Sequence, residues 1–272
     1  MTPHAASDLN EHLGLRRQDG VAWITIDRPG RKNAFTPEMI ARLTEIGEEL
    51  SCDDESRVVV IGGVGSDFCS GADFGDIAES ALQSGAERSR TFDEGLATRV
   101  QPLLRAFLAL RQPIVASARG YAIGLGVQFL LFADLVVASQ TLKIMVPQVR
   151  LGHALDHGES FLLPRRIGPS KAMELALLGE TMNAVDAERF GLVNFLVSDE
   201  ELERKTDEAV AKLLRTSFAS SWRSKALMRS AETNDLEAQL AAERRHVSAC
   251  VGTEDFVEAI AAFREKREPQ FK

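Results

Sequence analysis

The chain is 272 residues long and carries a formal net charge of −8 at pH 7. That length can bury a sizeable core, and its 44% apolar and 26% charged residues argue against a disordered chain. The acidic balance argues against a nucleic-acid partner, because neutralising phosphates needs an excess of Lys and Arg.

Segments rich in β-branched residues predict a series of strands with helices between them. In chain order, the strands are expected at 21–27, 57–61, 113–118, 135–138 and 192–197. One helix should begin at Pro37, because Thr36 before it is a good N-cap. Another is bracketed by Pro169 and Gly179. Strands that alternate with helices in this way predict an α/β fold with crossover connections.

The pattern changes near residue 199, after which only helices are predicted. They are expected at 200–214, 221–230, 236–249 and 255–266. The chain is therefore expected to divide into an α/β core, residues 1–198, and an all-helical region, residues 199–272.

Cysteine usage and hydropathy favour a cytoplasmic protein without a membrane partner. The three cysteines are widely spaced and include no CxxC pair, which suits a reducing compartment and supports no structural zinc. Residues 1–11 are polar and unlike a signal peptide. The longest apolar tract, 121–138, is interrupted by Gln128 and Asp134, so it is expected to be buried in the fold rather than in a bilayer.

Two glycine-containing segments each follow a predicted strand. They are residues 65–73, GSDFCSGAD, and residues 119–126, RGYAIGLG, and the second opens an apolar helix. Glycine lets a ligand approach the main chain, and a helix that begins there offers free N–H groups. Either segment alone is typical of an ordinary strand-to-helix turn, and neither has the Lys-Ser or Lys-Thr of a phosphate loop. The two together, in this order, indicate a functional site.

These and other motifs resemble those of the crotonase, or enoyl-CoA hydratase/isomerase, family. The resemblance lies in Asp27-Arg28-Pro29 with Arg31-Lys32-Asn33-Ala34, in the two oxyanion segments 68–73 and 120–126, and in the motifs at 163–168, 187–193 and 262–267. The motifs follow the family's order and span nearly the whole chain.

The resemblance implies a crotonase-like spiral of ββα units followed by helices that assemble trimers, often paired into hexamers. It implies an acyl-CoA thioester as substrate, with coenzyme A as part of that substrate and no separate cofactor. By position, the amides of Ala72 and Leu125 would form an oxyanion hole for the thioester oxygen. Two such amides in a dry site can supply roughly 3 kcal/mol. Leu125 is larger than the residue usual there, but only its N–H is required.

Several further residues are expected at the substrate by the same resemblance. Lys32 and Lys266 would contact phosphates of coenzyme A, with Lys266 reaching the ligand of a neighbouring subunit, and Arg28 lies in the same basic cluster. The full set of substrate-binding residues is Arg28, Lys32, Ala34, Asp73, Phe74, Gln128, Gln148 and Lys266. Asp76 and Glu79 are further candidates for the pocket lining.

The chain departs from the family's hydratases at both of their catalytic glutamates. Those positions hold Gln128 and Gln148. An amide can orient a water or a substrate, but it cannot accept a proton as a carboxylate does. Ordinary enoyl-CoA hydration is therefore expected to be weak or absent.

Asp156 is the acid that remains at a catalytic position. It falls where dienoyl-CoA isomerases and chlorobenzoyl-CoA dehalogenases carry a catalytic aspartate. It could act as a base or as a nucleophile, and the alternative is a turn aspartate that caps the next helix. His153, His157 and Glu159 lie nearby, but their spacing matches no established metal motif. We expect structural or surface histidines and no metal.

The leading hypothesis is an acyl-CoA-transforming enzyme with Asp156 as its acid/base and Ala72 and Leu125 as oxyanion donors. Double-bond isomerisation is the first choice of reaction, and thioester-linked hydrolysis is the second. The loss of both glutamates motivates an alternative, a non-catalytic acyl-CoA-binding protein. A nucleotide-binding α/β protein is a remote third hypothesis.

Overall fold

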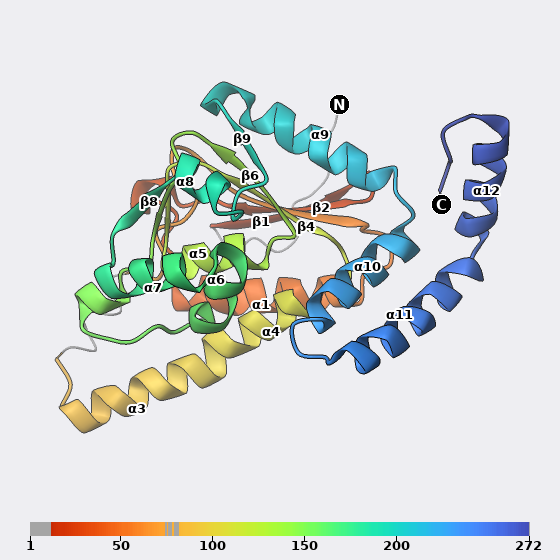
Figure 1. Ribbon diagram of the computed structural model, residues 1–272. Coiled ribbons are helices and arrows are strands. Elements are labelled where there is room, and N and C mark those ends of the chain that lie inside the picture. The colour runs from red at the N-terminus through yellow and green to blue at the C-terminus, as the bar shows by residue number, and fades with distance from the viewer. Residues whose placement is uncertain (1–11, 74, 76–77, 79–81, 272) are drawn as a thin grey trace.

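The computed structural model describes residues 12–73, 75, 78 and 82–271 (Figure 1). The strands are β1 Leu13–Gln18, β2 Val21–Ile26, β3 Val58–Gly63, β4 Ile114–Ala118, β5 Tyr121–Ile123, β6 Leu135–Ser139, β7 Lys143–Met145, β8 Thr181–Asn183 and β9 Phe195–Val197. The helices are α1 Pro37–Ser51, α3 Gly85–Gly95, α4 Gln101–Leu108, α5 Leu125–Phe132, α6 Glu159–Ile167, α7 Pro169–Leu178, α8 Ala184–Arg189, α9 Leu202–Leu214, α10 Phe218–Ser230, α11 Leu236–Val251 and α12 Glu254–Glu265. Short 3-10 turns are η1 Pro29–Arg31, η3 Gln148–Leu151 and η4 Asp199–Glu201, and η2 Leu96–Val100 is π-helical.

The strands form two sheets. The larger has the order β1-β2-β3-β4-β6-β9, and the smaller has the order β5-β7-β8. In the larger sheet only the β1–β2 hairpin is antiparallel, and each later neighbour is parallel. Parallel neighbours need a crossover, and here a helix or a long connection supplies each one.

The two sheets grow together in repeated units. Strand β4 lies in the large sheet, β5 in the small one, and α5 follows, while β6, β7 and α6 repeat the same order. This arrangement confirms the expected crotonase-like spiral of ββα units. It also places the turns after β3 and β4 at the same edge of the large sheet, where the carboxyl ends of parallel strands meet.

Helices cover both faces of the large sheet (Figure 1). On one face, α1, α4 and α5 bury the main core, whose largest fully buried side chains include Phe35, Phe107, Phe129 and Phe132. On the other face, α9 packs against β4 and β6 over a valine-rich layer. The central strands β3, β4 and β6 are thus buried on both sides, which explains why they read as largely apolar runs rather than as an alternation of apolar and polar residues.

Local signals predicted most of these elements. Helix α1 begins where expected, because the Thr36 hydroxyl accepts a hydrogen bond of 3.3 Å from the Met39 N–H. Helix α7 and the five predicted strands are confirmed, with ends shifted by up to three residues. Strands β1, β5, β7 and β8 were not predicted. Three of them have only three residues, and β1 carries two arginines that mask its pattern.

The tail after residue 199 is helical, as expected. Helix α10 is fixed to the core at Asp134, whose carboxylate lies 2.7 Å from the Lys225 ammonium and 3.1 Å from the Arg229 guanidinium. Helices α11 and α12 extend away from the sheets and expose large apolar side chains such as Phe256 and Phe263 (Figure 1). The division at 198/199 and the trimer or hexamer stay predictions. Within the residues described, none of the helices is long and apolar enough to cross a membrane.

Candidate active site

The two predicted oxyanion segments lie side by side. The Cys69 N–H donates to the Tyr121 carbonyl at 2.9 Å, and the Ile123 N–H donates back to the Cys69 carbonyl at 3.0 Å. Ala72 forms a further bridge with Phe35, at the start of α1. The turn after β3 is therefore held between the turn after β4 and the entry to α1.

Glycines make this close approach possible. A Cβ added at Gly126 would lie 2.3 Å from the Cys69 carbonyl oxygen, and one added at Gly120 would lie 1.9 Å from the Ser66 carbonyl oxygen. Both distances are far below van der Waals contact, so only glycine fits. Gly71 has a φ of 91°, and a Cβ there would lie 3.6 Å from the Leu125 nitrogen. Gly71, the residue directly before Ala72, therefore lies against the first turn of α5.

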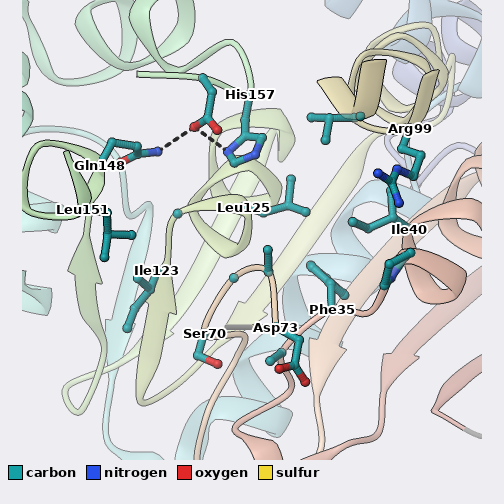
Figure 2. Close-up of a pocket in the computed structure, with 18 of the residues that line it drawn as sticks. Phe35, Ile40, Ser70, Asp73, Arg99, Ile123, Leu125, Gln148, Leu151 and His157 are labelled. Carbon is teal, nitrogen blue, oxygen red and sulfur yellow. Dashed lines mark hydrogen bonds and ion pairs between the residues drawn. The ribbon is translucent and has the colours of Figure 1, made fainter. Parts of the chain in front are cut away.

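Two backbone N–H groups at this junction have no hydrogen-bond acceptor among the residues described. Leu125 is the first residue of α5, where helical N–H groups have no partner inside the helix. Both sequence neighbours of Ala72 are hydrogen-bonded to Phe35. The Phe35 N–H donates to the Gly71 carbonyl, and the Phe35 carbonyl accepts from the Asp73 N–H. Within the described chain, neither the Ala72 nor the Leu125 N–H donates a hydrogen bond. Both residues line a cavity of about 660 Å³ (Figure 2).

The cavity has an apolar middle and polar ends. Phe35, Ile40 and Leu125 form part of the apolar wall, as Figure 2 shows. Helix α3 and the π-helical η2 supply one whole side, with Thr91, Phe92, Gly95, Leu96, Arg99 and Val100. The sequence patterns had not predicted this wall. A second cavity of about 210 Å³ adjoins the first and shares Leu96, Val100, Asp156 and His157 with it.

Asp156 lines the cavity and is held by two neighbours. Its Oδ1 accepts a hydrogen bond of 2.9 Å from Gln148 Nε2 and lies 2.9 Å from His157 Nδ1 (Figure 2). Burial by itself would raise the pKa of Asp156, but hydrogen bonding and charge from His157, with the Gln148 bond, lower the pKa overall. The side chain is therefore ionised at neutral pH. Helix α6 has Gly158 as its N-cap, so the capping alternative for Asp156 is not what the structure shows.

Glu159 is the polar residue whose importance the sequence did not reveal. It is wholly buried at the start of α6, and its Oε2 accepts a hydrogen bond of 2.5 Å from Gln148 Nε2. Burial, followed by the negative charge of Asp156, raises the pKa of Glu159 to about 9. Glu159 is therefore protonated at neutral pH. A polar residue within one helical turn of Asp156 was the only signal available in the sequence.

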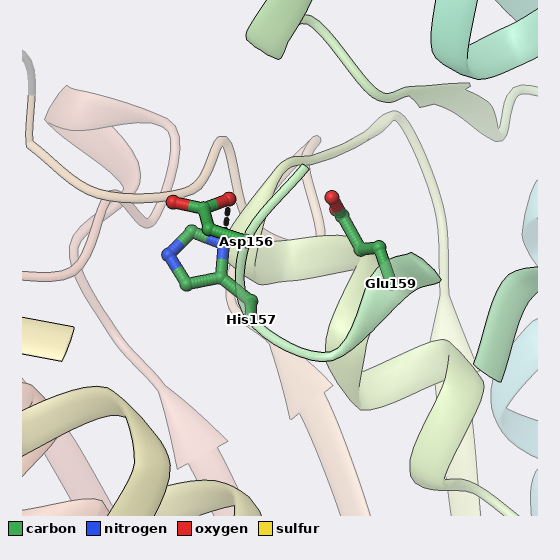
Figure 3. Close-up of side chains that lie close together, drawn as sticks. All are labelled: Asp156, His157 and Glu159. Carbon is green, nitrogen blue, oxygen red and sulfur yellow. Dashed lines mark ion pairs between the residues drawn. The ribbon is translucent and has the colours of Figure 1, made fainter. Parts of the chain in front are cut away.

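Asp156, His157 and Glu159 form a compact cluster (Figure 3). One polar atom of each lies within 4.8 Å of the others, a spacing short enough to enclose a cation. Because Glu159 keeps its proton, the cluster presents a single carboxylate at neutral pH. The expectation of no metal stays a prediction.

Several predicted substrate-binding residues lie at the cavity. Lys32, Ala34, Asp73 and Gln148 line it, and the Lys32 ammonium lies 4.4 Å from the centre of the Tyr121 ring. Their contacts with a substrate stay predictions.

The other predicted residues lie elsewhere. Arg28 is not among the lining residues, and its guanidinium donates to Asp73 Oδ2 at 2.6 Å. Gln128 is wholly buried behind the wall. Lys266 ends α12, outside the lining of this chain's cavity. Phe74, Asp76 and Glu79 fall outside the described residues.

Two histidines and one cysteine complete the description of the site region. His153 and His157 line the cavity, and their expected role as structural or surface groups stays a prediction. Cys69 is wholly buried, and burial raises the pKa of its thiol to about 12. A buried thiol that stays protonated at neutral pH packs in the core and is a poor nucleophile.

Comparison with known proteins identifies the family. The family model described as enoyl-CoA hydratase/isomerase matches residues 16–272. The chain is 32% identical to 1,2-epoxyphenylacetyl-CoA isomerase of Escherichia coli K12, over 93% of this chain and 95% of the relative. It is 31% identical to 2,3-dehydroadipyl-CoA hydratase of the same organism, over 96% and 98%.

Solved structures give the same result. An enoyl-CoA hydratase from Mycobacterium smegmatis superposes with a TM-score of 0.87 and 28% identity, covering 96% of this chain and 98% of the other. An enoyl-CoA hydratase from Bacillus anthracis superposes with a TM-score of 0.88 and 25% identity, covering 96% and 99%. The chain belongs to the enoyl-CoA hydratase/isomerase family.

Proposed function

We propose that this protein is an isomerase of acyl-CoA thioesters in which Asp156 moves a proton between carbons of the acyl group. The observation that carries the proposal is that an ionised Asp156 lines the same cavity as the free N–H groups of Ala72 and Leu125. The similarity to a relative named 1,2-epoxyphenylacetyl-CoA isomerase supports isomerase chemistry for this chain.

In the proposed reaction, the thioester oxygen accepts hydrogen bonds from Ala72 and Leu125. Asp156 removes a proton from a carbon next to the thioester or conjugated with it, and the electron pair of the broken C–H bond passes onto the thioester oxygen. The two N–H groups stabilise the enolate that results. The protonated Asp156 then returns the proton to a different carbon, which moves the double bond and restores the carboxylate.

Asp156 is a weak base, because its pKa is lowered. The reaction therefore depends on strong stabilisation of the enolate rather than on the strength of the base. The cavity suits this requirement, since its middle is apolar and a hydrogen bond gains strength where water is excluded.

Coenzyme A is part of the substrate in this proposal, and no separate cofactor is needed. Lys32 lines the cavity and would contact the anionic part of coenzyme A. Lys266 would contact the ligand of a neighbouring subunit in a trimer or hexamer. The exposed apolar side chains of α11 and α12 are compatible with such an assembly.

The test is Asp156→Asn assayed with a panel of enoyl-, dienoyl- and aroyl-CoA thioesters. We expect isomerisation to fall by about 10²- to 10⁴-fold, with binding of the thioesters retained in calorimetry. The matched control is Asp207→Asn on the exposed side of α9, which should match the unmodified protein.

Three outcomes would contradict the proposal. Unchanged turnover in Asp156→Asn would remove this residue from the mechanism. Release of free coenzyme A from the panel would point to hydrolysis instead. Tight thioester binding without any product would favour the non-catalytic binding protein.

A further inference from the structure

Glu159 is a buried carboxyl group for which the proposed reaction has no use. It is the first residue of α6 and has no exposed surface. It is also absent from the lining of both cavities, so it cannot touch a substrate there. A buried carboxyl is costly for a fold to keep, so its neighbours should indicate what it does.

The contacts of Glu159 lead to Asp156 through one amide. Gln148 Nε2 donates to Glu159 Oε2 at 2.5 Å and to Asp156 Oδ1 at 2.9 Å. A primary amide has two N–H bonds, so one serves each carboxyl. Both N–H groups of the Gln148 amide are therefore used. The bond to Glu159 fixes the amide plane and with it the direction of the N–H that points to Asp156.

The second glutamine also lies against Glu159. The wholly buried Gln128 on α5 lies near the Glu159 carboxyl, although its Nε2 makes no hydrogen bond to a described residue. The Oε1 atoms of Gln128 and Gln148 are buried and have no hydrogen-bond partner among the residues described. A protonated carboxyl carries the O–H that such an oxygen needs. The proton of Glu159, placed on the Oε1 that has no partner among the residues described, could therefore satisfy one of these two glutamine oxygens.

We propose that Glu159 is a positioning residue that orients the Gln148 amide and, through it, holds Asp156 toward the substrate. This inference rests on the proposed function, because it gives Glu159 a task only if Asp156 is the acid/base. Glu159 itself transfers no proton to or from the substrate.

The charge state of Glu159 fits this role. Burial and then the charge of Asp156 raise the pKa of Glu159 to about 9, so the acid/base site holds one negative charge at neutral pH. A second charge beside Asp156 would disfavour the enolate, which is itself an anion. The groups that face this pair are His157 and His153, while α5 and η3 contribute only the uncharged Gln128 and Gln148. On α7, which packs against α6, Lys171 is paired with Glu174.

The experiment compares Glu159→Gln with Glu159→Ala, using the isomerisation assay over a range of pH. Glu159→Gln keeps a neutral group whose oxygen can accept from Gln148. We expect its kcat at pH 7 to lie within about threefold of the unmodified protein, because the hydrogen bond survives. Glu159→Ala frees the Gln148 amide, and we expect kcat to fall by about 10- to 100-fold with KM little changed.

The pH profile separates positioning from a purely structural role. In the unmodified protein, kcat should fall as the pH rises through about 9, where Glu159 ionises beside Asp156. That alkaline fall should be absent from Glu159→Gln. The matched control, Glu188→Gln on the exposed side of α8, should keep it.

Two results would overturn the inference. One is a folded Glu159→Ala with the kcat of the unmodified protein. The other is a Glu159→Gln that retains the alkaline fall, and this test remains even if Glu159→Ala does not fold. Either result beside an inactive Asp156→Asn would refute only the role of Glu159, whereas an active Asp156→Asn would refute the proposed function itself.

Discussion

Replacing Gly126 by Ala should disable the proposed oxyanion hole without touching any side chain of the cavity. The new Cβ would lie 2.3 Å from the Cys69 carbonyl oxygen and 3.1 Å from Cys69 Cβ. Ordinary contact then requires the first turn of α5 to move by about 1 Å away from the neighbouring turn. That turn carries the Leu125 N–H, so the distance between the two donors would change by a similar amount.

A displacement of this size has a predictable consequence. A misplacement of about 1 Å at a reacting centre can lower the rate about 10²-fold, which corresponds to roughly 2.7 kcal/mol of transition-state stabilisation. Overpacking the junction should also lower the free energy of unfolding by about 1–3 kcal/mol. We therefore expect a folded protein with a lower melting temperature and a much lower kcat.

The assay is kcat/KM for isomerisation, with urea unfolding and calorimetric thioester binding measured on the same samples. Gly85→Ala is the matched control, because no atom lies within 4 Å of a Cβ built at the start of α3. It should leave the rate unchanged. A Gly126→Ala variant with the activity of the unmodified protein would refute the assignment of the Leu125 N–H to the thioester oxygen.

Three further predictions follow from other contacts. Leu125→Pro deletes the N–H at the first position of α5, where a helix tolerates proline, so kcat should fall by about 10²- to 10³-fold. Leu125→Ala keeps the N–H, and its kcat in a parallel assay should fall far less. Asp134→Ala leaves the buried Lys225 ammonium and the Ile114 N–H without their carboxylate. The free energy of unfolding in urea should fall by about 3 kcal/mol. An unchanged free energy of unfolding would contradict the docking of α10 at Asp134. Glu159 binds its proton more tightly in the folded protein than in the unfolded chain. Its contribution to the free energy of unfolding is therefore complete below the usual pKa of 4.5 and declines as the pH rises to about 9. Melting curves measured over this pH range should show the decline, and Glu159→Gln should flatten it.

The fold was largely predictable because its signals are local. Thr36 and Pro37 mark the start of α1, and the apolar runs of β3, β4 and β6 are buried on both faces. The two glycine segments were predictable for the same reason, since a residue such as Gly126 reports a close approach of backbone. Family resemblance then assigned Ala72, Leu125 and Asp156 to one site, and in the structure all three line the same cavity.

The remainder depended on contacts between distant elements. The wall formed by α3 and η2 reads in sequence as an ordinary polar helix, and only its packing turns Phe92 and Leu96 toward the cavity. The role of Glu159 was missed because its neighbours in the fold, Gln148 and Gln128, lie 11 and 31 residues away by sequence number. Its burial follows from how α6 packs on α5, which no local pattern reveals.

The glycine contacts at the junction also bear on how such a protein can diversify. The atoms proposed to meet the thioester belong to the main chain, so almost any residue can stand at positions 72 and 125 and still supply them. The information that sets their position resides in neighbours that carry no functional group, above all Gly120 and Gly126. A saturation mutagenesis library should therefore tolerate change at the donor residues and reject it at these glycines. The side chains that face the acyl group can then change without loss of the donors, which allows the protein to accept new substrates.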